Sequence, residues 1–247
     1  MAKRRLDAIL SHVGVCSRRE AKTLAKLGQL TVNGEVVRDA SCQVDVDRDV
    51  MMLNGRVVQY RRHIYLMLNK PSGVLSATED ARQRTVVDLL PPEWRHFSPF
   101  PVGRLDRDTE GLLLLTSDGE LAHRLLSPRF HVAKRYIAWL DGSLPPEATD
   151  RFRAGIELKD GTRTLPAELR ILRGEAPAVA EVVLYEGKYH QVKRMFSAVG
   201  RHVTALKRVA MGTLELDPLL QPGEWREIQP RELAGLRREA GLAGERS

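Results

Sequence analysis

The chain has 247 residues, of which 43% are hydrophobic and 29% charged. This balance excludes a chain dominated by disorder and suits one large domain or two modest ones. No apolar run exceeds a few residues, which excludes a membrane-spanning helix. The net charge of +7 and the pI near 9.6 indicate a polyanionic partner. Because the basic start leads into an amphipathic segment and not a secretory signal, we expect a cytoplasmic protein.

The positive charge is concentrated at the amino terminus. Residues 1–38 contain eight Lys or Arg against three acidic residues. A charge that only keeps a protein soluble is spread over its surface, so this concentration predicts a surface that binds phosphates. The two cysteines, Cys16 and Cys42, are too few for a disulfide framework or a cysteine-only zinc site, and we expect both to pack beside their apolar neighbours.

Two helices are predicted in this basic segment. Residues 6–13 place apolar side chains at the spacing of a helix with one buried face, and Gly14 is placed to end it. The run from Ser17 to Glu20 matches a capping box and predicts a second helix that ends near residue 27. One face of this helix carries cations at three- and four-residue spacing, namely Arg18, Arg19, Lys22 and Lys26.

Two hairpins are predicted after these helices. Asn-Gly pairs at residues 33–34 and 54–55 are typical of type I′ turns. The helices and hairpins together predict a small α/β module over residues 1–60. This module has neither a metal cluster nor a nucleophile with a base, so we expect it to bind and not to catalyse.

A second domain is expected over residues 61–235, after a basic linker at residues 61–63. Apolar or alternating runs predict strands at residues 64–68, 136–140, 165–172, 178–185 and 213–216, and short helices at residues 120–126 and 191–199. This order predicts the α+β class, with a mixed, mostly antiparallel sheet and flanking helices. Residues 236–247 are expected to form a frayed tail.

A charged loop precedes the most apolar run of the chain, residues 112–116, which is typical of a buried strand. The loop holds Arg104, Asp106, Asp108 and Glu110 between two glycines. It therefore places ionisable groups at the mouth of a hydrophobic core, where we expect the chemistry of the protein.

Four interpretations of this loop are open. It matches the first half of a calcium-binding EF-hand, but Ser117 stands where the bidentate glutamate belongs. The carboxylates of a two-metal nuclease usually come from several strands, and here arginines share the loop. Nearby cations favour an ionised carboxylate, which suits a nucleophile or a base. The structural interpretation is an aspartate that caps a turn or pairs with Arg104.

Four segments of the second domain resemble motifs of the pseudouridine synthases, in order and spacing. They are residues 65–71 (Tyr-Leu-Met-Leu-Asn-Lys-Pro), 103–116 (beginning Gly-Arg-Leu-Asp), 134–136 (Lys-Arg-Tyr) and 187–195 (Gly-Lys-Tyr-His-Gln-Val-Lys-Arg-Met). Residues 1–60 resemble the RNA-binding module shared by a small-subunit ribosomal protein, tyrosyl-tRNA synthetases and several RNA-modifying enzymes. The combination resembles the RsuA branch of pseudouridine synthases, which modifies small-subunit (16S) ribosomal RNA.

This resemblance implies a catalytic role for Asp106, which either attacks the sugar C1′ or removes a ribose proton to give a glycal. It implies that Lys193 orients this carboxylate and that Tyr136 lies against the uracil ring. No cofactor or metal is required. His190 is left out of catalysis as a residue that caps or packs, and Asp108 and Glu110 are left to turn or surface roles.

The resemblance also implies an RNA partner, either ribosomal RNA or a ribosomal assembly intermediate. We further expect no membrane partner and a monomer. Substrate contacts are expected from the four cations of the second helix and from three residues near the motifs, Arg104, Lys188 and Arg194. Lys207 and Arg208 are expected to add phosphate contacts. Two alternatives stay open: a large-subunit (23S) rRNA pseudouridine synthase and a non-catalytic RNA-binding assembly factor.

Overall fold

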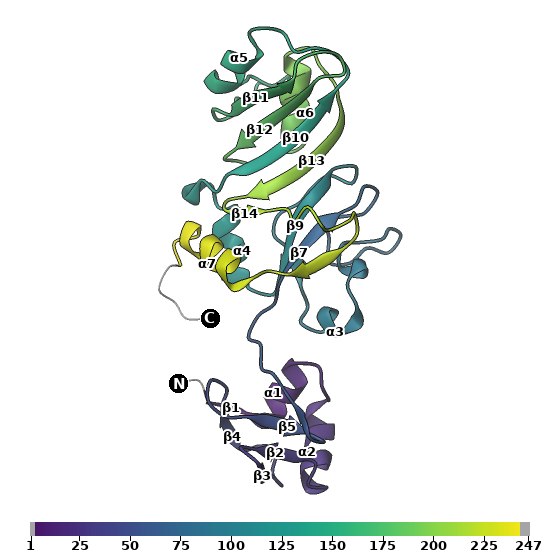
Figure 1. The fold of residues 1–247 in the computed structure, drawn as a ribbon, viewed down its shortest axis with the longest axis vertical. Coiled ribbons are helices and arrows are strands. Elements are labelled where there is room, and N and C mark those ends of the chain that lie inside the picture. Colours follow the sequence, from purple (N-terminus) through teal and green to yellow (C-terminus); the bar gives the residue numbers. More distant parts are fainter. Residues whose placement is uncertain (1–2, 243–247) are drawn as a thin grey trace. The chain divides into compact units, whose positions relative to one another are not determined.

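A computed structural model describes residues 3–242 of the chain (Figure 1). The chain divides into two compact units. One takes Met1–Ile64 and Pro91–Pro99, and the other takes Tyr65–Leu90 and Phe100–Ser247. Among the described residues, no helix is long and apolar enough to cross a membrane.

The first unit is a small α/β module. Its strands β2, β3, β5 and β6 form one antiparallel sheet in the order β3-β2-β5-β6, and β1 pairs with β4. The elements are β1 (Lys3–Arg5), α1 (Leu6–His12), α2 (Arg18–Lys26), β2 (Leu30–Val32), β3 (Glu35–Val36), β4 (Gln43–Asp45), β5 (Met51–Leu53), β6 (Arg56–Val57) and the short α3 (Pro92–Arg95).

Local sequence signals explain the module. The Ser17 hydroxyl accepts a hydrogen bond from the Glu20 amide, and the Glu20 carboxylate accepts one from the Ser17 amide, so the capping box is confirmed. Both Asn-Gly turns have positive φ at both residues, as type I′ turns require. The apolar faces of α1 and α2 bury Leu6, Ile9 and Ala21 in the module core.

Residues 91–99 belong to this unit, although the chain supplies them from within the larger domain. The imidazole Nε2 of His96 lies 2.7 Å from the carbonyl oxygen of Ser11. The ring of Phe97 packs edge-on against that of His12, with centroids 5.7 Å apart. The predicted module, residues 1–60, therefore omits this segment. Packing between residues distant in the chain places residues 91–99 in the module, and no local sequence pattern indicates it.

The second unit is built on one sheet with the strand order β11-β12-β10-β13-β9-β7-β15. Strands β9 and β13 run parallel, and the other pairs are antiparallel, which confirms the predicted α+β class. The elements are β7 (Tyr65–Lys70), η1 (Val87–Leu89), β8 (Phe100–Pro101), β9 (Glu110–Thr116), α4 (Gly119–Leu126), η2 (Pro128–Phe130), β10 (Lys134–Leu140), α5 (Ala148–Ala154), β11 (Glu168–Arg173), β12 (Val179–Leu184), α6 (Gln191–Ala198), β13 (Val203–Met211), β14 (Leu214–Glu215), β15 (Trp225–Glu227) and α7 (Pro230–Glu239).

Strand β9 lies near the middle of this sheet, between β13 and β7. Its Leu112 and Leu115 are fully buried, as expected for an apolar run covered on both faces. The neighbouring strand β13 was not predicted. It carries the buried Arg208 among its apolar residues, and a buried cation breaks the alternation by which a strand is recognised.

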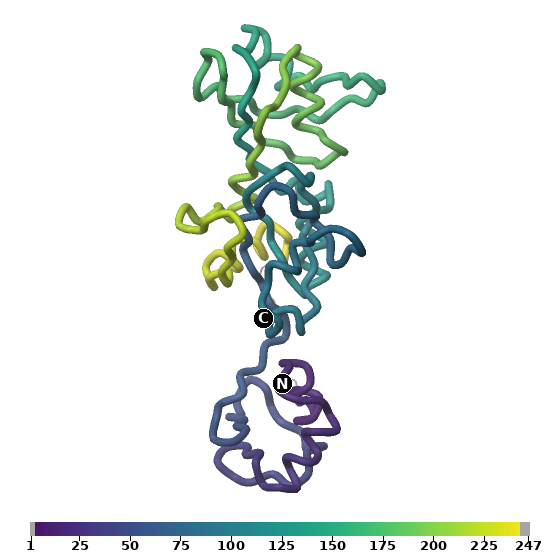
Figure 2. Tube along the Cα trace, turned by 90° about the vertical axis from the view of Figure 1, so that its right-hand side faces the viewer, coloured from purple at the N-terminus to yellow at the C-terminus, as the bar shows by residue number. Residues whose placement is uncertain are grey.

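The carboxyl-terminal helix α7 lies beside α4, as Figures 1 and 2 both show. Leu236 and Ala240 are fully buried, and Leu242 is nearly so. The frayed tail expected from residue 236 is therefore wrong up to residue 242, because these apolar side chains complete the core beside α4. Residues 243–247 of that predicted tail lie outside the described residues.

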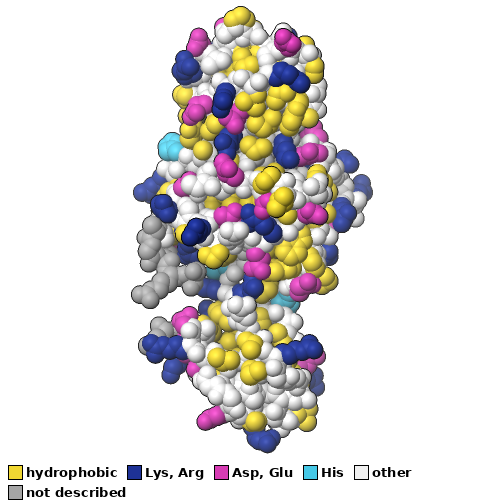
Figure 3. Space-filling view, in the orientation of Figure 1, with side chains coloured by type: hydrophobic (Ala, Val, Ile, Leu, Met, Phe, Trp, Pro, Cys, Tyr) yellow, Lys and Arg dark blue, Asp and Glu magenta, His cyan; other side chains and the backbone are white. Residues whose placement is uncertain are grey.

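The half of the sheet made of β10 to β13 is covered on one face only. Figure 1 shows α5 and α6 on that face, where alternate residues of β10 and β12 are buried. The other residues of these strands are half-exposed, and the described chain places no helix over them. Figure 3 shows apolar side chains gathered on this open face over β10 and β13.

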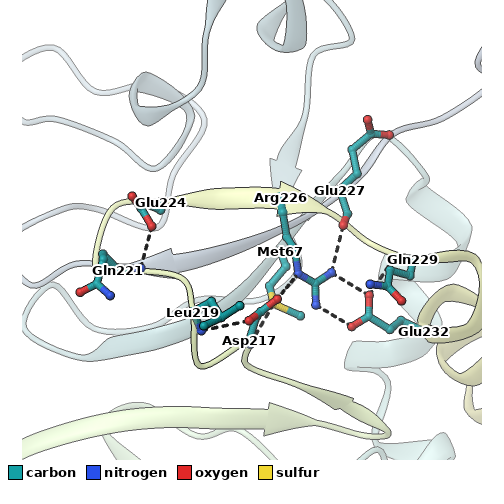
Figure 4. Close-up of polar contacts among 9 residues, drawn as sticks. All are labelled: Met67, Asp217, Leu219, Gln221, Glu224, Arg226, Glu227, Gln229 and Glu232. Atoms are coloured by element: carbon teal, nitrogen blue, oxygen red, sulfur yellow. Dashed lines mark hydrogen bonds and ion pairs between the residues drawn. The ribbon is translucent and has the colours of Figure 1, made fainter.

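An ion-pair network joins β15 to α7 (Figure 4). The guanidinium of Arg226 donates to both carboxylate oxygens of Glu232, at 2.8 and 2.7 Å, and to Asp217 at 2.7 Å. Glu232 also accepts from the Gln229 amide at the start of α7. Hydrogen bonds from Arg226 hold the pKa of Glu232 below its ordinary value. The backbone amide of Leu219 and, after it, the Arg226 guanidinium lower the pKa of Asp217.

Replacing Arg226 by methionine is expected to lower the free energy of unfolding by about 2 kcal/mol at pH 7, since two charged partners lose their donor. A carboxylate with a lowered pKa stabilises the fold above its unfolded pKa and loses that contribution as pH falls through its folded value. The difference in free energy of unfolding between wild type and Arg226→Met should therefore shrink as the pH falls from about 5 to about 2. Urea unfolding at pH 7 and pH 3 measures it, and the exposed Arg231→Met on α7 is the control; an equal effect at both pH values contradicts the linkage.

Candidate active site

The loop that carries Asp106 is fixed on both sides of that residue. The Ser76 hydroxyl accepts from the Leu105 amide at 3.1 Å and donates to the Leu105 carbonyl at 2.9 Å. The Thr109 amide donates to the Asp106 carbonyl at 3.1 Å, which closes a turn. The backbone of Asp106 is therefore anchored while its side chain stays 27% exposed and within reach of a substrate.

A buried lysine holds the second half of the loop. The Nζ atom of Lys70 donates to the carbonyl oxygens of Arg107 and Thr109, at 3.1 and 2.9 Å, and to that of Pro71 at 3.1 Å. Burial lowers the pKa of Lys70 to about 8, against the opposing pull of three nearby carboxylates. Strand β7 thus positions the Asp106 loop through a residue that does not itself line the cavity around Asp106.

Asp106 lies in a cavity of ≈ 80 Å³. The phenol-bearing side chain of Tyr136 lines it from β10, and Leu184 and Leu206 add apolar walls from β12 and β13. Arg104 and Lys188 also line the cavity, so residues from the Asp106 loop, from β10, β12 and β13 and from the segment before α6 meet around one carboxylate. The cavity thus joins an aromatic and apolar wall to charged side chains, a combination that suits a planar polar ring.

Lys193 and His190 reach Asp106 from the start of α6. The Nζ atom of Lys193 lies 3.4 Å from Oδ2 of Asp106, and Nε2 of His190 lies 3.5 Å from Oδ1. His190 adopts the left-handed conformation with φ of 48° as the N-cap of α6, and its ring stacks on that of Tyr189. Sequence reasoning left His190 aside, although its place three residues before Lys193 at a helix start was a usable signal.

Asp108 shares the Lys193 ammonium with Asp106. The Lys193 Nζ lies 2.6 Å from Oδ1 of Asp108. This hydrogen bond contributes most to holding the pKa of Asp108 below its ordinary value. Asp108 lies at the surface as expected, with its side chain 70% exposed, and it also contacts the cation of the site, which the sequence did not indicate. The ammonium lies between two carboxylates, and its position depends on both.

Arg194, Arg208 and the four cations of α2 do not line the Asp106 cavity. The guanidinium of Arg194 pairs with Asp160 at 2.5 Å. Arg208 is only 2% exposed and donates to the Leu112 carbonyl at 2.8 Å, so its expected phosphate contact is wrong. The four cations of α2 are exposed on the first unit.

Within residues 3–242, no group of three or more His, Cys, Asp or Glu side chains is arranged to hold a metal ion. The Lys193 ammonium already pairs with both aspartates of the loop, at 3.4 and 2.6 Å. The arrangement suits chemistry at a single carboxylate that an ammonium holds in place.

Comparison with known proteins agrees with both units. Residues 64–198 match the model of the RNA pseudouridylate synthase family, and residues 4–50 match that of the S4 domain. A solved structure described as a pseudouridylate synthase superposes with a TM-score of 0.66 at 32% identity, covering 94% of this chain and 99% of that one.

Relatives from bacteria are similar over nearly their full lengths. An RNA pseudouridine synthase of Bacillus subtilis named YtzG is 49% identical over 93% of this chain and 96% of its own. The ribosomal large subunit pseudouridine synthase B of Bacillus subtilis is 38% identical, over 94% and 95% of the two chains. The ribosomal small subunit pseudouridine synthase A of Escherichia coli is 37% identical, over 94% and 99%. The chain therefore belongs to the RNA pseudouridylate synthase family and carries an S4 domain at its amino terminus.

Proposed function

We propose that this enzyme converts a uridine of small-subunit ribosomal RNA to pseudouridine, with Asp106 as the catalytic carboxylate. The observation that carries the proposal is the position of Asp106 in the cavity, with Lys193 at 3.4 Å and Tyr136 in the cavity wall. Overall identity does not separate the two ribosomal subunits, at 38% and 37%. The run His-Gln-Val-Lys-Arg-Met at residues 190–195 favours the small subunit, because it resembles that branch.

The reaction moves the uracil from N1 to C5 on the same sugar. The N1–C1′ bond breaks, the base turns, a C5–C1′ bond forms, and the proton on C5 leaves while N1 gains one. Atoms and electrons balance without an oxidant, a reductant or water. The carboxylate of Asp106 either attacks C1′ or removes a ribose proton, and both routes require it ionised.

Three neighbours take supporting roles in this proposal. The ammonium of Lys193 holds the Asp106 carboxylate in position and offsets its charge. The ring of Tyr136 packs against the uracil, and its phenol is placed to assist the proton transfer from C5. Arg104 is exposed at the cavity edge, where its guanidinium takes a phosphate or the vacated place in the base stack.

The S4 domain supplies affinity for the RNA backbone. Extraction of the target base from its stack costs a few kcal/mol, which backbone contacts offset. Replacing the α2 cations by alanine is expected to weaken RNA binding and to flatten its salt dependence by about one unit of slope for each phosphate that the variant no longer neutralises. Filter binding from about 50 to 300 mM salt measures this slope. The replaced residues are Arg18, Arg19, Lys22 and Lys26.

A matched control removes the same amount of charge from the other unit. It replaces four exposed cations of that unit, Lys159, Arg173, Arg231 and Arg238. The proposal expects little change in slope for this control. Equal slopes for both quadruple variants would show that only total charge matters and would refute the role of α2.

Mapping of pseudouridine in ribosomal RNA from cells that lack this protein tests the function itself. The proposal expects one missing small-subunit site that wild-type protein restores and an Asp106→Asn variant does not. A missing large-subunit site would assign the enzyme to the other branch. Full modification in the deletion strain would contradict the ribosomal substrate. The cytoplasmic location and the monomeric state stay predictions, and light scattering with size-exclusion chromatography measures the second.

A further inference from the structure

A second cavity, of ≈ 290 Å³, lies directly beside the Asp106 cavity and has no part in the mechanism above. Its lining includes Trp139 and Val203. Its polar lining includes Asp108, Glu110 and Thr204. It is larger than the ≈ 80 Å³ cavity that holds Asp106.

The strand lengths explain why this space is open. Strand β9 begins at Glu110, which pairs with Lys207 of β13. The earlier part of β13, including Val203 and Ala205, pairs with β10 alone among the described strands. Trp139 lies opposite Ala205 in that pairing and is half-exposed, in alternation with the buried Ala138 and Leu140. Trp139 thus lines the cavity where β13 extends beyond the start of β9.

The two cavities share a wall. Lys193 and Leu206 line both of them, and the Lys193 ammonium lies 3.4 Å from Asp106 and 2.6 Å from Asp108. A group in the second cavity is therefore one side chain away from a uridine held at Asp106. In an RNA chain, a part of a neighbouring nucleotide, either its base or its phosphate, would occupy that position.

The chemistry of the lining selects a base and not a phosphate. Splayed RNA bases stack on aromatic side chains and form hydrogen bonds with their edges, and Trp139 offers such a surface. The carboxylates of Asp108 and Glu110 repel phosphate but accept hydrogen bonds from an amino group. Each carboxylate has more than one acceptor site, so the Lys193 contact leaves Asp108 able to accept another donor.

We propose that this cavity binds the base of a nucleotide adjacent to the target uridine, and that it selects a base with an exocyclic amino group. The inference rests on the proposed place of the target uridine beside Asp106. It makes Trp139 the stacking residue and Glu110 the residue that reads the base edge. The pair determines which uridine is modified, beyond the contacts of the S4 domain.

The test measures kcat/KM on fragments of ribosomal RNA that contain the mapped uridine. In two of the fragments the 5′ or the 3′ neighbour is replaced by an abasic residue. The kcat/KM of the wild-type enzyme is expected to fall about tenfold or more on one of the two abasic fragments, because the stacking contact is lost. Trp139→Leu should lose a similar factor on intact RNA and show no further loss on that abasic fragment, and Trp139→Phe should recover most of the activity.

Ile137→Ala is the matched control, because Ile137 shares the strand and face of Trp139 and does not line the cavity. It should behave as wild type on every fragment. The inference is overturned if Trp139→Leu matches wild type on intact RNA, or if it loses the same further factor as wild type on the abasic fragment. A fold defect is recognised separately, because it lowers activity on all fragments without removing the difference between them.

Base identity tests the role of Glu110. Changing the selected neighbouring base to uracil should lower kcat/KM of the wild type. The Glu110→Gln variant should discriminate less between uracil and a base with an amino group, because an amide can also donate to a uracil carbonyl. An unchanged preference in Glu110→Gln would overturn the amino-group assignment. Asp106→Asn is assayed in parallel. If Asp106→Asn is active, the proposed function is refuted. If Asp106→Asn is inactive while Trp139→Leu behaves as wild type, only the present inference is refuted.

Discussion

Asp106→Asn is expected to lower the rate of pseudouridine formation by a factor of about 10⁴ or more, and to leave RNA binding nearly unchanged. The amide keeps the shape of the side chain but neither attacks C1′ nor removes a ribose proton. The backbone around residue 106 is held by Ser76 and Thr109, so the loop should keep its conformation. Single-turnover assays on ribosomal RNA fragments measure the rate, and filter binding measures the affinity.

The control for this variant is Glu147→Gln, which removes an exposed carboxylate before α5 that does not line the Asp106 cavity. It should retain full activity. Turnover of Asp106→Asn at the wild-type rate would contradict the assignment of the catalytic carboxylate. Loss of RNA binding together with turnover would instead indicate that the substitution disturbs the RNA-binding surface.

Lys193→Met is expected to lower kcat by about 10²–10³-fold, the loss typical when one preorganised charge partner of a reacting group is removed. The variant leaves Asp106 and Asp108 near each other without the ammonium that lies between them. Lys193→Arg keeps the charge but changes its geometry, so we expect partial activity. The measurement is kcat under saturating RNA, which separates this effect from weaker binding.

The exposed Lys159 provides the control, because Lys159→Met removes the same charge and length away from the cavity. Its kcat should be unchanged. If Lys193→Met raised KM and left kcat intact, the ammonium would bind substrate and not orient the carboxylate. That result would move Lys193 from the catalytic group to the RNA contacts.

Much of the site was readable because its signals are local. The apolar run of β9 indicated a buried strand, and the loop before it carried the carboxylate that the structure places in the cavity. Lys188 and Tyr136 were named from their motifs, and both line that cavity. The partnership of Lys193 with Asp108 was not readable, because the two residues meet only when α6 packs beside the loop.

Features that depend on a few neighbouring residues were determined by the sequence alone: the capping box of α2, the two Asn-Gly turns, the basic face of α2 and the buried run of β9. The tertiary structure decided what depends on distant partners. Arg208 is buried because the Leu112 carbonyl accepts from it, residues 91–99 join the first unit through His96 and Phe97, and α7 is ordered because Leu236 packs into the core beside α4. Backbone conformation follows from local sterics and hydrogen bonds, whereas the burial of a charge or a helix face depends on a partner elsewhere in the chain.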